Sequence, residues 1–165
     1  MPTMLDLLSK LPSRIHKILD EGAERGASRT AFTDERGIEW SYRRLIDTVA
    51  RVSAEMARLG VRSGDRVMIT CENSIAAIVL MYAASRLDAW AVMANARLSA
   101  HELDLIEQDS APRRIFYTDA ISKEADAHAE RRGASAQLFT GIGEIKVSAL
   151  NAEAVPERTY ADPAR

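Results

Sequence analysis

The chain has 165 residues, of which 47% are hydrophobic and 28% charged, and its formal net charge is −2. This length and composition suit one compact domain, and the balanced charge excludes the strongly basic surface that binds nucleic acid. No run of about 18 apolar residues occurs, so we expect no membrane span. The start lacks the pattern of a secretory signal, and Cys71 is the single cysteine, so we expect a cytoplasmic protein without an internal disulfide.

The first forty residues predict a helix followed by a β-hairpin. Isoleucine and leucine recur at helical spacing over 15–19. Two short apolar runs, 30–33 and 38–40, then flank the polar segment 34–37, which ends in glycine. Apolar runs around such a turn are typical of a hairpin.

The strongest helical pattern covers 41–59. Its apolar residues lie alternately four and three positions apart and form one stripe: Leu45, Val49, Val52, Met56 and Leu59. Ser41 is suited to cap the start of this helix and Gly60 to follow its end. Arg43 and Arg44 lie in the first turn, where the helix dipole disfavours cations, so we expect them to be solvated.

A strand–helix–strand succession follows. The apolar run 67–71 predicts a strand buried on both faces. The segment 75–87 is apolar nearly all round and predicts an interior helix, with Asn73 or Ser74 as its cap. A second buried strand is predicted at 89–93, so the two strands should be parallel and joined by a right-handed crossover.

The second half continues the α/β pattern. Ser99 and Glu102 form a capping box for a helix that ends before Pro112. The remaining pattern predicts, in order, a strand at 114–117, an exposed helix at about 120–132 and a strand at 136–139. Periodicity fades beyond about residue 141. We therefore expect an α/β fold of three layers, with a mostly parallel sheet, flanking helices and a short β-hairpin. It should occupy 1–150, and 151–165 should be an irregular tail.

Most strong chemical motifs are absent. No phosphate-binding loop of the Gly-x-x-x-x-Gly-Lys type occurs, and Gly141-Ile-Gly143 is only a fragment of a dinucleotide fingerprint. His16, His101 and His128 lack partners at metal-ligand spacing, so we expect three surface histidines.

Cys71 and Trp90 both lie in apolar runs, and for Cys71 a functional interpretation stands beside the structural one. Cys71 ends a predicted strand, and we expect a buried thiol that acts as a small hydrophobe. The alternative interpretation is that Cys71 lies near a ligand site, since α/β proteins bind ligands at the carboxyl ends of their parallel strands. Trp90 lies inside a predicted strand and is expected in the core.

Several segments in order resemble one family. They are Ile38-Glu-Trp-Ser-Tyr42, Leu59-Gly-Val-Arg-Ser-Gly-Asp-Arg-Val67, Glu72-Asn-Ser74, Asn95-Ala-Arg-Leu-Ser99 and Glu102-Leu103. Together they resemble the N-terminal portion of AMP-forming acyl-CoA synthetases, members of the adenylate-forming ligases, over about 11–116. Five positions depart from the residues usual in the family: Arg44, Glu72, Asp88, Ala91 and Ala96. The departures fit either a diverged member or a sequence no longer under full functional constraint. Asp88 replaces a usual glycine and would be strained at positive φ, and Glu72 replaces a proline.

The resemblance implies a two-step parent reaction. A carboxylic acid and ATP–Mg²⁺ give an acyl-adenylate, and CoA then takes the acyl group. In the family the ATP loop, acyl pocket, magnesium-linked glutamate and catalytic lysine come after the position of Arg165, so we expect no catalytic or metal-binding residue here and no activity of the isolated chain. Arg97 matches an arginine that contacts a phosphate of CoA in some relatives. The alternative role of Arg97 is structural: it would donate hydrogen bonds to nearby backbone carbonyls and so order its loop.

Two other functions stay open. One is a stand-alone, non-catalytic module that binds a partner chain across an exposed sheet edge, either the missing remainder of the enzyme or a second copy of itself. The other is a small Rossmann-like nucleotide binder, which the strand–helix–strand pattern favours and the missing glycine fingerprint disfavours.

Overall fold

The computed structural model describes residues 11–158. Its helices are α2 (Lys17–Glu24), α3 (Tyr42–Arg58), α4 (Ile75–Arg86), α5 (Ala100–Ser110) and α6 (Lys123–Arg131). Its strands are β1 (Thr30–Thr33), β2 (Glu39–Ser41), β3 (Arg66–Cys71), β4 (Trp90–Asn95), β5 (Arg114–Tyr117), β6 (Ser135–Phe139) and β7 (Gly143–Val147).

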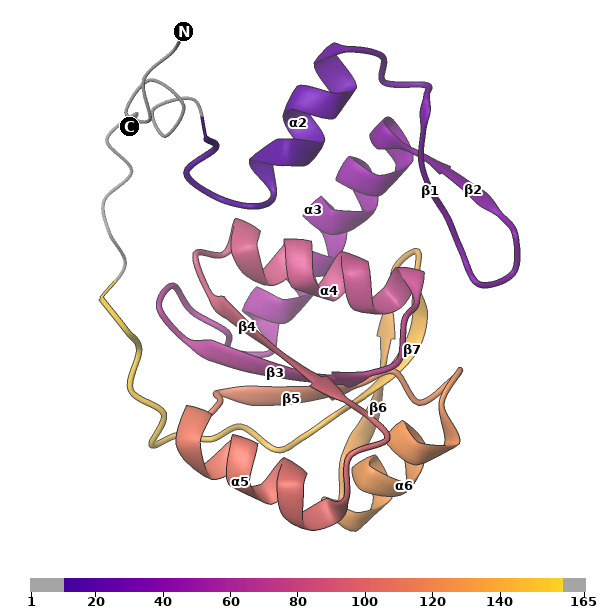
Figure 1. The fold of residues 1–165 in the computed structure, drawn as a ribbon. Helices are drawn as coiled ribbons and strands as arrows, with labels where there is room; N and C mark the ends of the chain where they lie inside the picture. Colours follow the sequence, from indigo (N-terminus) through magenta and orange to yellow (C-terminus); the bar gives the residue numbers. More distant parts are fainter. Residues whose placement is uncertain (1–10, 159–165) are drawn as a thin grey trace, which may run out of the picture.

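The centre of the molecule is a five-stranded sheet in the order β4-β3-β5-β7-β6. β3 is parallel to β4 and β5, whereas β7 is antiparallel to β5 and β6. Figure 1 shows α3 and α4 on one face of the sheet and α5 and α6 on the other. The predicted three-layer α/β fold is therefore confirmed, as is the antiparallel hairpin β1–β2, while the sheet is mixed and only partly parallel.

Local sequence signals place the helix starts. The Ser41 hydroxyl accepts from the Arg44 N–H at 3.2 Å at the start of α3, and the Ser74 hydroxyl accepts from the Ala77 N–H at 3.2 Å at the start of α4. The capping box is also present, since the carboxylate of Glu102 accepts the backbone N–H of Ser99. Each hydroxyl pairs a backbone N–H that the helix itself leaves unpaired.

The hairpin packs beside α3 around a buried tryptophan. Trp40 donates its indole N–H to the buried carboxylate of Asp34 at 3.1 Å. Arg44 is exposed, as expected, but its guanidinium carbon lies 3.7 Å from the centre of the Trp40 ring. A cation over an aromatic face is attracted to it. This contact offsets the unfavourable position of Arg44 in the first helical turn.

The prediction of a second buried strand at 89–93 was wrong in its burial. β3 is buried, but β4 lies at the end of the sheet and pairs only with β3 among the described strands. Trp90 is 50% exposed and Met93 45% exposed, so Trp90 is not a core residue. A run of apolar residues reports that a segment can be buried, and it carries no information about its place in the strand order.

The region after β5 also differs from expectation. α6 is not exposed all round, because Ala125 and Ala129 are fully buried. Gly141-Ile-Gly143 joins β6 to β7 in a hairpin, and β7 was not predicted at all. The glycines that suggested a fragment of a nucleotide fingerprint thus belong to a structural turn.

The end of the described chain lies along the amino edge of the sheet. Residues 151–158 contain no helix or strand. The guanidinium of Arg113 donates to the carbonyl of Asn151 at 2.8 Å, and the Glu157 N–H donates to the Gly64 carbonyl at 2.7 Å. Gly64 has a φ of 84°, and a Cβ there would lie 2.2 Å from the Glu157 oxygen. Only glycine permits this close approach.

Asp65 is a buried acidic residue at that edge and has two arginine partners. Its side chain is fully buried and accepts from the Arg62 N–H at 2.7 Å, and it lies 3.8 Å from the Arg113 guanidinium. Asp65→Ala would leave Arg113 buried without a counter-charge, so we expect the free energy of unfolding to fall by about 3 kcal/mol.

Asp65→Asn is the matched control, because it retains an acceptor for the Arg62 N–H and should lose less. Urea unfolding of the three chains measures the difference. Equal stability of wild type and Asp65→Ala would show that the pair does not hold this edge.

Asp88 adopts the left-handed conformation, with a φ of 55°. Its carboxylate pairs with Arg14 at 2.8 Å. Asp88→Ala and Asp88→Gly both remove this pair, but only glycine adopts positive φ without cost. We therefore expect Asp88→Gly to be more stable than Asp88→Ala by about 1 kcal/mol. Urea unfolding of the two variants tests this, and equal stabilities would contradict the strained backbone.

Candidate functional site

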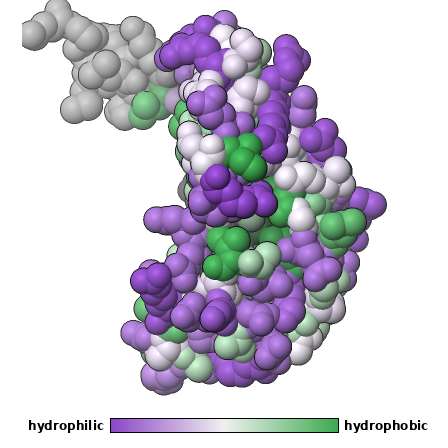
Figure 2. Space-filling view, turned by 90° about the vertical axis from the view of Figure 1, so that its right-hand side faces the viewer, coloured by the Kyte–Doolittle hydropathy of each residue, from purple (hydrophilic) through white to green (hydrophobic). Residues whose placement is uncertain are grey.

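The strands β3, β4 and β5 end at the same side of the sheet, where α/β folds bind ligands. A hollow of about 430 Å³ lies there, and the residues that define it include Cys71, Glu72, Asn73, Met93, Asn95 and Arg97. Figure 2 views the molecule from this side and shows hydrophobic residues around the middle of the face, between more polar regions above and below. The loops after β3 and β4 thus supply the polar groups of the hollow.

Arg97 lies at the rim of this hollow, with its side chain 71% exposed. Its guanidinium donates to the Glu72 carboxylate at 2.9 Å. The side-chain oxygen of Asn95 accepts the Arg97 backbone N–H at 2.9 Å and shapes the turn. The partner of Arg97 is therefore a carboxylate and not the backbone carbonyls that one expectation proposed.

Glu72 connects two elements at this edge. Besides Arg97, it accepts from the hydroxyl of Ser122, the cap of α6, at 3.2 Å. The hydrogen bond from Arg97 is the main reason that the pKa of Glu72 lies below its ordinary value, and the same bond raises the pKa of Arg97. Both groups are charged at neutral pH, so an anion that approaches Arg97 competes with an anion already in place.

The structure places Cys71 in the wall of the same hollow, but the thiol is largely buried and belongs to the core between the sheet and α4. Burial raises the pKa of the Cys71 thiol above its ordinary value. A nucleophilic cysteine needs the opposite shift, because the thiolate is the reactive form. The position of Cys71 thus comes from strand packing.

The expectation of three surface histidines holds only for His101. His16 is half-buried with its Nδ1 3.0 Å from the Ser85 hydroxyl, and burial lowers the pKa of His16. The Nε2 of His128 lies 3.2 and 3.1 Å from the carbonyls of Ala96 and Leu98 and supports the loop that carries Arg97. Within residues 11–158, no group of three His, Cys, Asp or Glu side chains could hold a metal ion.

Sequence reasoning singled out Arg97 but missed its partner. Glu72 and Arg97 are 25 residues apart in sequence. A signal was available, since each follows a predicted strand, and the two strands are parallel neighbours. A charged residue after each of two such strands indicates a contact at their carboxyl edge.

The fold and the motifs at its edges define the class of protein. The sequence profile of the family described as "AMP-binding enzyme" matches residues 19–163, and the chain belongs to this family. The resemblance seen in the sequence is thereby confirmed.

Curated relatives carry CoA-ligase names. The chain is 32% identical over 96 residues to the long-chain-fatty-acid–CoA ligase FadD13 of Mycobacterium tuberculosis, which is 54% of this chain and 19% of that protein. It is 34% identical over 95 residues to the 4-hydroxybenzoate–CoA/benzoate–CoA ligase of Rhodopseudomonas palustris, or 57% of this chain and 17% of that protein. The chain thus spans about a fifth of the length of these relatives.

Solved structures agree with the family. The N-terminal domain of FACL13 from Mycobacterium tuberculosis superposes with a TM-score of 0.59 at 28% identity, over 62% of this chain and 26% of that one. A putative long-chain-fatty-acid CoA ligase from Rhodopseudomonas palustris gives 0.56 at 29% identity, over 61% and 25%. Among the described residues, no helix is long and apolar enough to cross a bilayer.

The buried thiol gives a prediction for the hollow. Because burial holds Cys71 in its protonated form, we expect the native chain to react with Ellman's reagent at pH 8 at least about tenfold more slowly than the chain in urea. The reaction is followed by absorbance. A native rate equal to the unfolded rate would show that Cys71 is open to the hollow as a reactive group.

Proposed function

We propose that the chain is the N-terminal portion of an acyl-CoA ligase that joins a carboxylic acid to CoA by way of an acyl-adenylate. One observation carries this proposal. The AMP-binding family matches nearly the whole chain, and relatives at 32% and 34% identity are named as CoA ligases. The acyl substrate stays open, because these two relatives act on different acids by their names. The reaction would take place in the cytoplasm and belong to fatty-acid or related acid metabolism.

The isolated chain is proposed to be inactive. Attack of a carboxylate on the α-phosphate of ATP brings two anions together and needs Mg²⁺ and positioned donors. The hollow offers one cation, Arg97, which is already paired with Glu72. Cys71, with its raised pKa, does not supply the missing groups, and residues 11–158 contain no cluster of carboxylates that could do so. ATP, Mg²⁺ and CoA are thus assigned to the intact ligase.

Arg97 is proposed to contact a phosphate of CoA. Its guanidinium is exposed at the carboxyl edge, and its planar fork of donors fits phosphate oxygens. When CoA is bound, its phosphate would take the place of Glu72 on the guanidinium. Glu72 would therefore weaken the binding of CoA by holding the donors that the phosphate needs.

A second candidate function is a stand-alone, non-catalytic module that binds a partner. The described residues form a hydrophobic core on both faces of the sheet without any further chain. The exposed strand β4 is the specific observation that favours a partner.

The role of Arg97 is tested by titrating the intact ligase, of which this chain is proposed to be a part, with CoA in isothermal calorimetry. We expect a loss of affinity of about tenfold in Arg97→Ala and a gain of several-fold in Glu72→Gln, since the amide leaves the guanidinium free. Unchanged affinity in Arg97→Ala would overturn the assignment.

Pyrophosphate release provides a separate test of inactivity. We expect none with ATP–Mg²⁺ and a panel of fatty and aromatic acids. Release that depends on the acid and survives repurification to homogeneity would overturn it.

Arg58→Ala, at the exposed end of α3, is the control for non-specific loss of charge in the CoA titration.

A further inference from the structure

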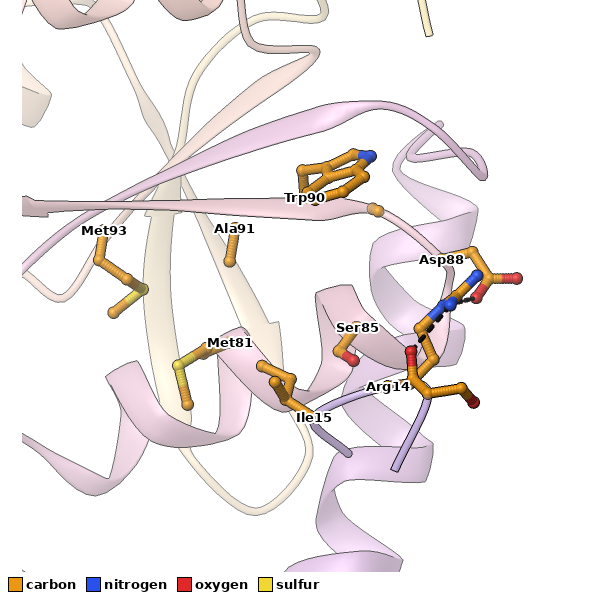
Figure 3. A pocket seen from close by; sticks show the side chains of 10 residues that line it. Arg14, Ile15, Met81, Ser85, Asp88, Trp90, Ala91 and Met93 are labelled. Atoms are coloured by element: carbon orange, nitrogen blue, oxygen red, sulfur yellow. Dashed lines mark hydrogen bonds and ion pairs between the residues drawn. The ribbon is translucent and has the colours of Figure 1, made fainter. Parts of the chain in front are cut away.

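Two arginines border hollows beside β4, and they differ in how deeply the fold encloses them. Figure 3 shows Arg14 paired with Asp88 at the start of the strand, in a hollow lined largely by apolar side chains such as Met81 and Met93. The Arg14 side chain is 24% exposed there, whereas that of Arg97, at the end of the strand, is 71% exposed. The guanidinium of Arg97 can therefore meet a ligand, and the affinity that it contributes depends on how firmly its loop is held.

His128 of α6 contacts this loop on both sides of Arg97. Its Nε2 lies 3.2 Å from the carbonyl oxygen of Ala96 and 3.1 Å from that of Leu98. A carbonyl oxygen only accepts hydrogen bonds, so Nε2 carries the hydrogen and shares it between the two oxygens. One side chain thus holds the residue before Arg97 and the residue after it.

Each of these two carbonyls belongs to a peptide group whose N–H is also bound. In the group that enters Arg97, the N–H donates to the side-chain oxygen of Asn95 at 2.9 Å. In the group that follows Leu98, the N–H of Ser99 donates to the carboxylate of Glu102 at 2.8 Å. A peptide group is planar and stiff, so a contact at both of its ends fixes its orientation. These two groups set the direction in which the Arg97 side chain leaves the loop.

Of these contacts, the one from His128 comes from another part of the fold. Asn95 and Glu102 are near Arg97 in the sequence and act within the loop and the first turn of α5. His128 is 32 and 30 residues away from the carbonyls that it binds. It lies on α6, whose Ala129 is fully buried in the core on that face of the sheet. His128 therefore joins a local turn to the packed body of the protein.

The same helix also holds the partner of Arg97. Ser122, the cap of α6, donates to the carboxylate of Glu72 at 3.2 Å. α6 thus contacts the loop after β3 through Ser122 and the loop after β4 through His128. A single helix sets the separation of Glu72 and Arg97.

We propose that His128 is a positioning residue for Arg97, which holds the loop so that the guanidinium meets a phosphate of CoA at the carboxyl edge without being reordered. This inference rests on the proposed role of Arg97 in binding CoA. A loop that is ordered before the ligand arrives loses less conformational freedom on binding, so the ligand binds more tightly. His128 acts through the backbone of the loop and needs no contact with CoA.

The spectrum of the wild-type histidine rings tests the contact without any variant. Because both partners of Nε2 are acceptors, the His128 ring should carry its hydrogen on Nε2, and this proton should be visible by NMR. The ring proton of the exposed His101 should instead be lost by exchange with water. A His128 ring with its hydrogen on Nδ1 would overturn the proposal.

Hydrogen exchange of the chain tests whether the contact orders the loop. His128→Phe keeps a ring but removes the donor, and it should speed exchange of the Arg97 and Ser99 amides by about tenfold. His128→Gln places an amide N–H near the position of Nε2 and should restore most of the protection. His101→Phe is the matched control and should leave these amides unaltered. Unchanged exchange in His128→Phe, or equally faster exchange in β3 and β5, would overturn local positioning.

Steady-state kinetics of the intact ligase, of which this chain is proposed to be a part, test the consequence for CoA. We expect His128→Phe to raise the KM for CoA by at least about threefold, with the KM for ATP unchanged, and His128→Gln to restore it. In an Arg97→Ala background, His128→Phe should have no further effect on the KM for CoA, because it acts through Arg97.

The outcomes separate this proposal from the one on which it rests. An unchanged KM for CoA in Arg97→Ala would overturn the role of Arg97 in the proposed function, and with it that of His128. A raised KM in Arg97→Ala but not in His128→Phe, or an equal rise in the KM for ATP, would overturn the positioning role alone.

Discussion

The buried carboxylate of Asp65 fixes the amino edge of the sheet, and the positions of the other elements depend on it. It ends the turn after α3 and starts β3 by accepting the Arg62 N–H. The backbone carbonyl of Asp65 accepts the N–H of Trp90, and this hydrogen bond fixes the register of β4 against β3. Its charge faces Arg113, whose guanidinium also donates to the carbonyl of Gly60 at 3.2 Å. The Asp65 side chain thus orders the turn before β3 and holds Arg113 before β5, whereas the contact with β4 is made by the Asp65 backbone.

The amino and carboxyl edges of the sheet are held together by different kinds of contact. At the amino edge, Gly64 and the segment 151–158 lie in backbone contact, and a side chain added at Gly64 would collide with them. At the carboxyl edge the loops after β3 and β4 contact each other through the half-buried Glu72 and the exposed Arg97. The Gly-Asp-Arg-Val segment that carries much of the family resemblance therefore belongs to the structural edge. This part of the family resemblance thus comes from residues that build the fold, and a fold by itself does not define a function.

The sequence predicted well those features that local chemistry determines. Ser41, Ser74 and Ser99 cap helices because a hydroxyl before an apolar repeat pairs free N–H groups, wherever the helix lies in the fold. The order of strands was beyond the same reasoning. β7 pairs over five residues with β6, to which the turn at 141–143 joins it, but its place beside β5 depends on a strand that is distant in sequence. The exposure of Trp90 is a consequence of that order.

The candidate site was predictable only in part, for the same reason. Arg97 stood out because its loop follows a strand, and Cys71 because it ends one. The contact between Arg97 and Glu72 required knowledge that β3 and β4 are neighbours in register, with Cys71 opposite Asn95. The environment of Cys71 likewise depends on α4, which closes over β3 and keeps the thiol in the core.

Two of the departures from the family pattern, Asp88 and Glu72, share one physical feature. Asp88 and Glu72 each bring in a carboxylate, and each carboxylate pairs with an arginine, Arg14 at 2.8 Å and Arg97 at 2.9 Å. At these two positions the new carboxylate has an arginine partner, so each change is compensated, as in a diverged member of the family. The compensation acts differently at the two places. The Asp88 pair offsets a strained backbone at the start of β4, whereas the Glu72 pair connects the loops after β3 and β4.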